Sequence, residues 1–456
     1  MLRQMRPIQL SAGRRQAWNL HDDHKRIGRN ALYVLVFVLI GRCAGALKEI
    51  AIAYFYGVSP IVDAFQLTFN LMTWVPSTLV SVLGIILVPL LVQVRLLGSE
   101  ERALFLAELN TAVVATGCAT STLLYLAWPY ALHVFAKSLS AESAGFSLQF
   151  AKGLAPLTIE ILLIAQFSAR LQAQEKHVNS MLECVPAATL LCAVVMFHRI
   201  SAVNSLMLGT LVGFGLQALC LYIAVKMNDD IGAPFKLGFS SRHWPGLLHA
   251  IGLFSIGQIV LCLAVPVDQF FAVDLGPGAV ATLGYTNRLL ALILAVGALA
   301  IGRAILPVLT DVLQTRSKER AIGIAVRWCF VMFISGSIIV VLGWVGAPIL
   351  VKLLFQRGAF TIYNTQTVAT ALRPGLLQIP FNLGMIVLMQ MFSSLGKYRI
   401  MSVIAVFGFV TKIIANFLLV KMLGVEGILL ATSIMYLSIF GAYLVAARRL
   451  IREQVK

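Results

Sequence analysis

The sequence is poor in charge. Asp, Glu, Lys and Arg make up 12% of its 456 residues, whereas soluble domains carry about 25%. Hydrophobic residues make up 59%, and apolar windows of about 20 residues, long enough to cross a bilayer as a helix, recur along the whole length. This composition excludes an ordinary soluble domain. Because lipid offers the backbone no outside hydrogen-bond partner, it indicates an all-α polytopic membrane protein.

Several chemical signatures are also missing. None of the seven cysteines belongs to a CxxC pair or lies near a metal-type histidine cluster, so we expect neither a disulfide framework nor a metal site. The absence of Walker P-loop, HExxH and GxSxG motifs, together with short extramembrane loops, indicates a protein that is not an enzyme and holds no bound cofactor. Energy for transport would then come from a Na⁺ or H⁺ gradient, the membrane potential or the supply of substrate. The polar N-terminus, residues 1–30, does not resemble a cleavable signal peptide.

Hydropathy predicts about twelve transmembrane helices. They cover residues 31–55, 64–93, 104–128, 148–172, 178–198, 202–225, 247–273, 279–311, 322–345, 366–394, 400–420 and 425–447. With the N-terminus placed in the cytoplasm and the span edges taken to within a few residues, 24 of the 36 Lys and Arg residues fall in or near cytoplasmic segments, 7 in or near outer segments and 5 further inside spans. The positive-inside rule therefore predicts a multi-pass protein of the bacterial inner membrane with both termini cytoplasmic.

The distribution of charge also explains its excess. The net charge of +17 lies mostly on the predicted cytoplasmic face, where Lys and Arg are expected to meet anionic lipids. Nucleic acid is therefore not a predicted partner.

An internal repeat appears at an offset of about 218 residues. The matching features are Gly84 and Pro89 with Gly302 and Pro307, Glu101-Arg102-Ala103 with Glu319-Arg320-Ala321, and Pro156 with Pro374. Because six spans separate equivalent positions, both halves have the same orientation, which predicts a parallel repeat of two six-helix lobes around a central cavity. The expected domains are a basic segment 1–30, lobes 31–226 and 247–447, a cytoplasmic linker 227–246 and a tail 448–456.

The first span carries charged side chains in its middle, where placing a charge in the bilayer is unfavourable in free energy. Arg42, Lys48 and Glu49 lie within it, and a cation at the bilayer centre costs about 2.5–3.5 kcal/mol. Arg288 lies in the eighth span, at the position that the repeat matches to Asn70 of the second span. We expect the three cations to converge on the central cavity and to hold a diphosphate, which suits the arginine fork. The alternative is local pairing of Lys48 with Glu49 or Asp63, and of Arg42 with a backbone carbonyl.

Two carboxylates and two further cations lie in or beside spans. Asp63 either caps the second span or acts in gating, through a contact with a first-span cation that forms in one conformation. Asp268 lies deep in the seventh span, where an unpaired carboxylate is costly, so it is a candidate for a coupling cation or proton. Lys412 is intramembrane, and Arg303 lies close enough to the cytoplasmic end to snorkel.

Three segments resemble the MurJ/MviN family of lipid II flippases, within the superfamily of multidrug, oligosaccharidyl-lipid and polysaccharide exporters. The run GRCAGALKEIAIAYFYGVSPIVDAF at 41–65 resembles that family's first helix, turn and second-helix start. LFQRGAF at 354–360 is similar to its periplasmic segment, and TNRLL at 286–290 resembles its eighth-helix signature. The resemblance implies two lobes that alternate between inward-open and outward-open states and flip a polyprenyl-diphosphate-linked sugar to the periplasmic face.

The resemblance also implies roles for single residues. Arg42, Lys48 and Arg288 stand where family members place cavity cations, with Lys48 in place of a usual Arg, and Asp63 stands at a matching acidic position.

Asp268 and Asn416 resemble part of a sodium site found in some members of the family. Val420 stands where that site has a further carboxylate. There are two other departures from the family pattern. The stretch WVPSTL at 74–79 replaces an Arg-Arg pair, and twelve spans are predicted where lipid II flippases usually have fourteen.

The leading interpretation is a flippase for a lipid-linked glycan, either lipid II or the repeat unit of a surface polysaccharide. Its partners would be that lipid and a glycan polymerase or synthase. One alternative is a cation-coupled exporter of drugs with the same fold, whose cavity should be acidic and aromatic. The other is a non-transporting membrane accessory of glycan synthesis, which would tolerate neutral replacements throughout the cavity.

Overall fold

The computed structural model describes residues 37, 39–95, 99–135, 139–174, 176, 178–228, 235–295, 318–395 and 397–455. All regular secondary structure in these residues is α-helical, as predicted. In the described residues, each of the twelve predicted spans overlaps one helix or two consecutive helices. The predicted portions at 31–36 and 296–311, and Arg303 with them, lie outside the described residues, as do positions 1–30.

The N-terminal half begins with a helix over residues 39–56. It continues with α2 (Pro60–Arg95), α3 (Ser99–Phe135), α4 (Ala141–Leu154), α5 (Leu157–Gln172), α6 (Val178–Leu182), α7 (Val185–Phe197) and α8 (Ala202–Asn228). The predicted span 148–172 is in fact two helices, α4 and α5, which meet at an angle of 44°. Pro156 lies at this break, where its missing N–H and its ring disfavour a continuous helix.

The C-terminal half begins with α9 (Trp244–Cys262) and α10 (Ala264–Val273), followed by the helix Ala279–Ala295. It continues with α12 (Lys318–Phe355), α13 (Ile362–Leu376), α14 (Gln378–Ser394), α15 (Tyr398–Leu423) and α16 (Val425–Val455). Among the described helices, eight are long and apolar enough to cross a membrane singly, and nine if the bent α4–α5 pair counts as one span. The helix over 39–56 carries the charged residues of the first predicted span.

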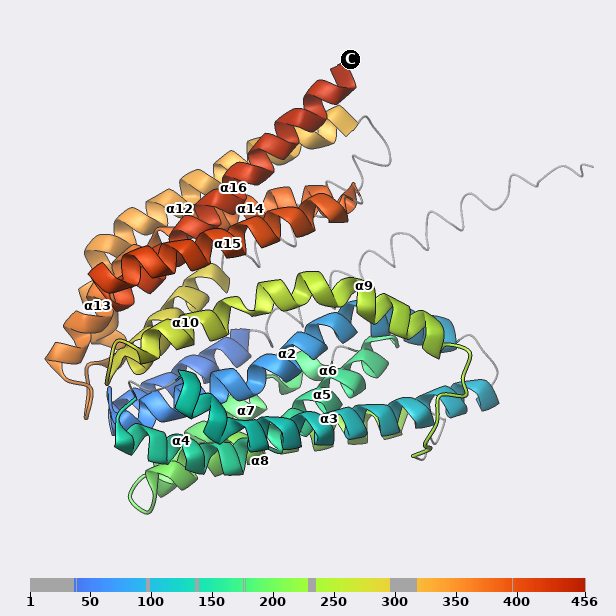
Figure 1. Ribbon diagram of the computed structural model, residues 1–456, viewed down its shortest axis with the longest axis horizontal. Helices are drawn as coiled ribbons and strands as arrows, with labels where there is room; N and C mark the ends of the chain where they lie inside the picture. The colour runs from blue at the N-terminus through green and yellow to red at the C-terminus, as the bar shows by residue number, and fades with distance from the viewer. Residues whose placement is uncertain are drawn as a thin grey trace, which may run out of the picture.

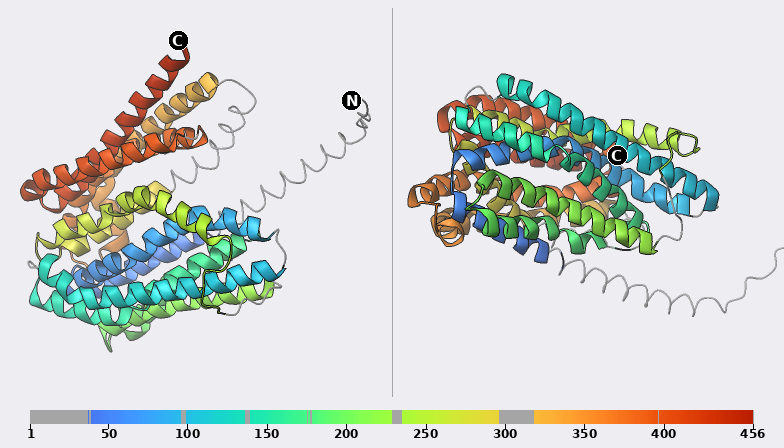
Figure 2. Two further views of the ribbon diagram at one scale, coloured as in Figure 1. Left: turned by 45° about the vertical axis from the view of Figure 1, so that its right-hand side comes forward. Right: turned by 90° about the horizontal axis from the view of Figure 1, so that it is seen from below.

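The helices form two bundles (Figure 1). Helices α2–α8 make up one bundle and α12–α16 the other, with α9 and α10 running between them. The bundles converge at one end and diverge toward the other in both Figures 1 and 2. We call the first the closed end, which holds the turns 57–59, 274–278 and 356–361, and the second the splayed end, which holds residues 235–243 and the end of α16.

The segment that joins the bundles is attached to the first of them. Glu108, buried on α3, accepts hydrogen bonds from the backbone N–H of Ser240 at 2.8 Å and of Ser241 at 3.1 Å. Its carboxylate also accepts one from Trp244 Nε1 at 2.7 Å. Three donors on one carboxylate satisfy a buried charge, so the linker and the start of α9 are fixed to α3 at the splayed end.

The two halves meet on their repeat axis. Helix α2 and the helix Ala279–Ala295 touch at the closed end, where Asp63 accepts a hydrogen bond from the N–H of Ala281 at 2.6 Å. One turn further on, Gln66 lies so close to Gly284 that a methyl group on this glycine would fall 1.3 Å from Gln66 Oε1. Both pairs are 218 residues apart. Residues that touch their own equivalents lie on a two-fold axis, so the predicted offset holds at this crossing.

Candidate functional site

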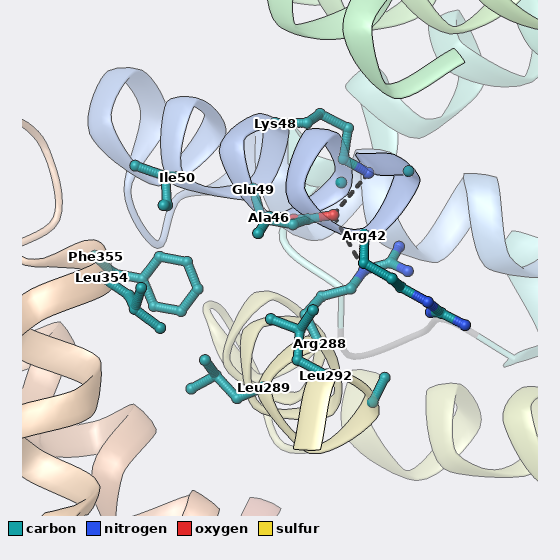
Figure 3. Close-up of a pocket in the computed structure, with 13 residues that line it drawn as sticks. Arg42, Ala46, Lys48, Glu49, Ile50, Arg288, Leu289, Leu292, Leu354 and Phe355 are labelled. Atoms are coloured by element: carbon teal, nitrogen blue, oxygen red, sulfur yellow. Dashed lines mark ion pairs between the residues drawn. The ribbon is translucent and has the colours of Figure 1, made fainter. Parts of the chain in front are cut away.

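A pocket with a volume of about 140 Å³ lies between the two halves. Arg42, Lys48 and Glu49 from the first helix line one side, Arg288 from the helix Ala279–Ala295 lines the other, and Phe355 at the end of α12 lies toward the closed end (Figure 3). The structure thus brings together the three cations that the sequence predicts to converge.

Glu49 occupies the centre of this group. Its Oε1 atom lies 2.7 Å from Lys48 Nζ and 3.1 Å from Arg288 Nε. Glu49 is only 5% exposed, so its charge is compensated mainly by these two cations. The pair with Lys48 is the local pairing considered from the sequence. The pair with Arg288 was not predicted, because it joins residues of different halves. The sequence feature that could have indicated such a pair is Glu49 itself, a carboxylate in the same apolar span as Arg42 and Lys48.

Arg42 completes the charged wall of the pocket. Its guanidinium extends on the same side of Glu49 as that of Arg288, away from Phe355 (Figure 3). Glu183, at the break between α6 and α7, is near enough to interact electrostatically with Arg42. With three cations and one carboxylate, the lining has a net charge of plus two. Guanidinium groups bind phosphate oxygens in a bidentate manner, so this wall suits a dianion.

Aromatic side chains fill the space between the pocket and the closed end. The ring of Tyr285 lies 5.3 Å from that of Phe355 and 5.4 Å from that of Phe360. The Tyr285 hydroxyl donates a hydrogen bond to the carbonyl of Gly57 at 2.9 Å. All three rings are buried. They form a plug contributed by the C-terminal half, and the Tyr285 hydroxyl attaches it to Gly57 of the N-terminal half.

The segment 354–360 packs directly on the end of the first helix. The N–H of Ala359 donates a hydrogen bond to the carbonyl of Tyr54 at 2.8 Å. Gly57 and Gly358 both have a φ of +59°, which favours glycine. A methyl group on Gly57 would lie 2.5 Å from Ala359 O, and one on Gly358 would lie 2.3 Å from Tyr54 O. The two backbones therefore approach more closely than any side chain would permit.

Asp63 also joins the two halves at the closed end, through partners that the sequence did not suggest. Its carboxylate accepts hydrogen bonds from the N–H of Gly278 at 2.5 Å and of Ala281 at 2.6 Å. Gly278 directly precedes the helix Ala279–Ala295 and Ala281 lies in its first turn, where unpaired donors and the helix dipole favour an anion. Asp63 is 1% exposed. It therefore caps a helix of the other half, whereas the sequence suggested a cap on its own helix or a pair with a first-span cation.

The residues suggested for a coupling cation also lie together. Asp268 on α10 lies 2.8 Å, through Oδ2, from Lys412 Nζ on α15. Its Oδ1 accepts a hydrogen bond from Asn416 Nδ2 at 3.4 Å. The contact between Asp268 and Lys412 was not foreseen, although each residue was singled out.

A sequence model of the family described as lipid II flippase MurJ matches residues 52–455 of this chain. The chain belongs to the MurJ family. It is 27% identical over 231 residues to a probable lipid II flippase MurJ of Bdellovibrio bacteriovorus, a match that covers 49% of this chain and 42% of that protein. It is 21% identical over 416 residues to a probable lipid II flippase MurJ of Rickettsia prowazekii, covering 89% and 81%.

Solved structures share the MurJ fold. A lipid II flippase MurJ in an inward closed conformation superposes with a TM-score of 0.81 at 18% identity, covering 91% of this chain and 87% of that one. A multidrug-resistance transporter of the MATE family in an inward-facing conformation gives a TM-score of 0.74 at 15% identity, covering 90% and 95%. These likenesses establish the two-lobe architecture.

One departure from the MurJ pattern is visible at the pocket. The stretch WVPSTL lies inside α2, with Pro76 in the helix interior. Among the described residues, those that line the pocket come from the first helix, the helix Ala279–Ala295 and α12, and none from α2.

Proposed function

We propose that this member of the MurJ family flips a polyprenyl-diphosphate-linked glycan precursor across the bacterial inner membrane by alternating access. The observation that carries the proposal is the pocket between the lobes, whose lining holds Arg42, Lys48 and Arg288 against a single carboxylate, Glu49. The diphosphate of such a lipid carries about two negative charges, which matches the net charge of this lining.

The conformation suits uptake from the cytoplasm. The positive-inside rule predicts that the termini and the splayed end lie in the cytoplasm, and the closed end would then face the periplasm. In this state the aromatic plug and the cap made by Asp63 block the periplasmic side. The headgroup would enter the pocket from the cytoplasmic side while the polyprenyl tail stays in lipid. The basic cytoplasmic segments would rest on anionic lipids, and a glycan polymerase or synthase would use the flipped product.

Substrate binding would act on a contact between the lobes. Glu49 and a diphosphate compete for the same donors on Lys48 and Arg288. When phosphate oxygens take over Arg288, the ion pair that joins the first helix to the helix Ala279–Ala295 weakens. A ligand shifts a conformational equilibrium only through such differential contacts, so this exchange would couple binding to rearrangement of the lobes.

The charge of the pocket also separates the leading proposal from its alternatives. A cavity of net positive charge repels cationic drugs, whereas the relatives in Bdellovibrio and Rickettsia are both described as probable lipid II flippases. These descriptions support lipid II as the first substrate to test and a surface-polysaccharide repeat unit as the second. An accessory protein without transport activity would have no need for three cations in one cavity.

The test is mass spectrometry of lipid-linked intermediates in cells depleted of this protein. Accumulation of lipid II would assign it to cell-wall synthesis, and accumulation of another polyprenyl-diphosphate glycan would assign it to a surface polysaccharide. If no lipid-linked intermediate changes, the proposal is wrong.

Variants tested in the depleted cells address the pocket itself. Arg42→Ala and Arg288→Ala should fail to clear the accumulated lipid at normal protein level, because each removes a guanidinium from the diphosphate site. Lys421→Ala, on an exposed residue near the end of α15, is the matched control and should clear it. Normal activity of both pocket variants would refute the diphosphate site.

A further inference from the structure

Helices α10 and α15 are joined by a buried ion pair. Asp268 is 8% exposed, and Lys412 is 2% exposed although lysine has a long side chain that normally reaches water. Lys412 and Asn416 are four residues apart and therefore project from the same face of α15. Both contact Asp268, Lys412 through Oδ2 at 2.8 Å and Asn416 through Oδ1 at 3.4 Å.

The oxygen atoms at this place are those that bind a small cation. Carboxylate and amide oxygens are the preferred ligands of hard cations. Asn416 is completely buried, and its amide oxygen has no hydrogen-bond partner among the described residues. An orphaned amide oxygen beside a buried carboxylate is unusual in a protein interior, and it is the arrangement expected of a cation site.

A protein cation already occupies the carboxylate. Lys412 Nζ and Asp268 together are neutral, so a metal ion added beside them would bring an uncompensated charge into the interior, which is strongly disfavoured. The residues present therefore do not fit a dissociable sodium ion, even though Asp268 and Asn416 resemble part of a sodium site. Val420, in place of a further carboxylate, gives the same indication, since its side chain offers no oxygen.

We infer that the ammonium group of Lys412 is the permanent cation of this site, and that the native protein needs no dissociable cation there. Removing the lysine side chain should leave a buried carboxylate and an amide oxygen without a partner, which then bind an alkali cation from solution. This inference concerns the ion requirement of the C-terminal lobe and stands whichever lipid is transported.

The experiment measures the melting temperature of the purified full-length protein in chloride salts of sodium, lithium, potassium and choline at equal ionic strength. The wild type should melt at the same temperature in all four salts. Lys412→Ala should melt about 5 °C or more lower in choline, and sodium or lithium should raise its melting temperature in a saturable manner. The double variant Lys412→Ala/Asp268→Asn, which lacks both charges, should show no saturable response.

Lys421→Ala, on the same helix but exposed, controls for loss of a lysine and should behave as the wild type. A saturable stabilisation of the wild type by sodium would overturn the inference, because it would show that a dissociable cation binds the native chain. Insensitivity of Lys412→Ala to every alkali cation would also overturn it. If that variant does not fold, Lys412→Met retains most of the side-chain volume and replaces it, and the wild-type titration is decisive by itself.

Discussion

The close approach of Gly358 to the first helix makes the closed end testable with a single methyl group. A Cβ at position 358 would lie 2.3 Å from the carbonyl oxygen of Tyr54 and 3.1 Å from its carbonyl carbon. Both are backbone atoms, which cannot rotate away as a side chain can. Gly358→Ala must therefore push the segment 354–360 away from the first helix.

The expected magnitude has two parts. The left-handed φ of +59° costs alanine about 1–2 kcal/mol, but this cost applies in every conformation that keeps the turn. The displacement acts only on the closed state, where it breaks the hydrogen bond from Ala359 N to Tyr54 O and loosens the packing around it, about 1–2 kcal/mol in total. The population closed at this end should therefore fall by about 5- to 30-fold relative to the population open there.

The assay is a distance measurement across the closed end. Spin labels at Ile200, in the turn between α7 and α8, and at Tyr363, in the first turn of α13, report on different halves, and both positions are exposed. In a background without the native cysteines and in lipid nanodiscs, Gly358→Ala should move the distance distribution toward longer values.

A second glycine separates the two costs. Gly424 also has a φ of +59°, but apart from its chain neighbours no atom lies within 4 Å of the position that a Cβ would take. Gly424→Ala should lower stability without changing the distance between the labels. If the two variants shift the distribution equally, or if Gly358→Ala leaves it unchanged, the argument that backbone contact closes this end is refuted.

Three further predictions concern charged contacts. Asp63→Asn should shift the equilibrium at the closed end toward the open state by about 1–2 kcal/mol, because a neutral amide is a weaker acceptor for two backbone donors. The same label pair measures this shift. Glu142→Gln, in the exposed first turn of α4, is the control and should not change the distance distribution. A double-mutant cycle with Glu49→Gln and Arg288→Gln, measured with the same labels, should give a coupling free energy of about 0.5–1 kcal/mol. The value is modest because the Arg288 side chain is 44% exposed to solvent. A coupling free energy of zero would contradict an ion pair between the lobes. Glu108→Gln should accelerate tryptic cleavage of the linker several-fold by weakening its attachment to α3, and an unchanged rate would show that this attachment does not protect it.

Much of the architecture follows from hydropathy. A helix must be apolar over about 20 residues to cross the bilayer, and this requirement located the described spans. The breaks within spans were not predicted. The change from α9 to α10 at Leu263 lies inside a continuous apolar run, where hydropathy is similar on both sides. A bend changes the direction of a helix without changing its mean polarity.

The residues that line the pocket could be predicted from the sequence only where a charged side chain is energetically costly inside a span. A cation in a span is expensive, so Arg42, Lys48 and Arg288 stood out one by one. The pairing of Lys48 with Glu49 could be considered from the sequence, but the pairing of Arg288 with Glu49 could not, because it joins helices that are distant in sequence. The pair of Asp268 and Lys412, 144 residues apart, was missed for the same reason. Each side chain was recognised as costly, but the sequence contained no information on which costs cancel.

The repeat axis explains why the two halves carry different residues at the two positions where they touch. Near a two-fold axis, a residue faces its own equivalent, and two large identical side chains cannot occupy the same space. Here each pair combines a long side chain with a small one, Asp63 with Ala281 and Gln66 with Gly284. If Gly284 carried a methyl group, the Gln66 amide would have to leave the crossing. The divergence of the repeat at these positions is therefore a packing requirement of the closed end. It also allows a single carboxylate from α2 to cap the opposite helix, whereas two equivalent carboxylates on the axis would repel each other.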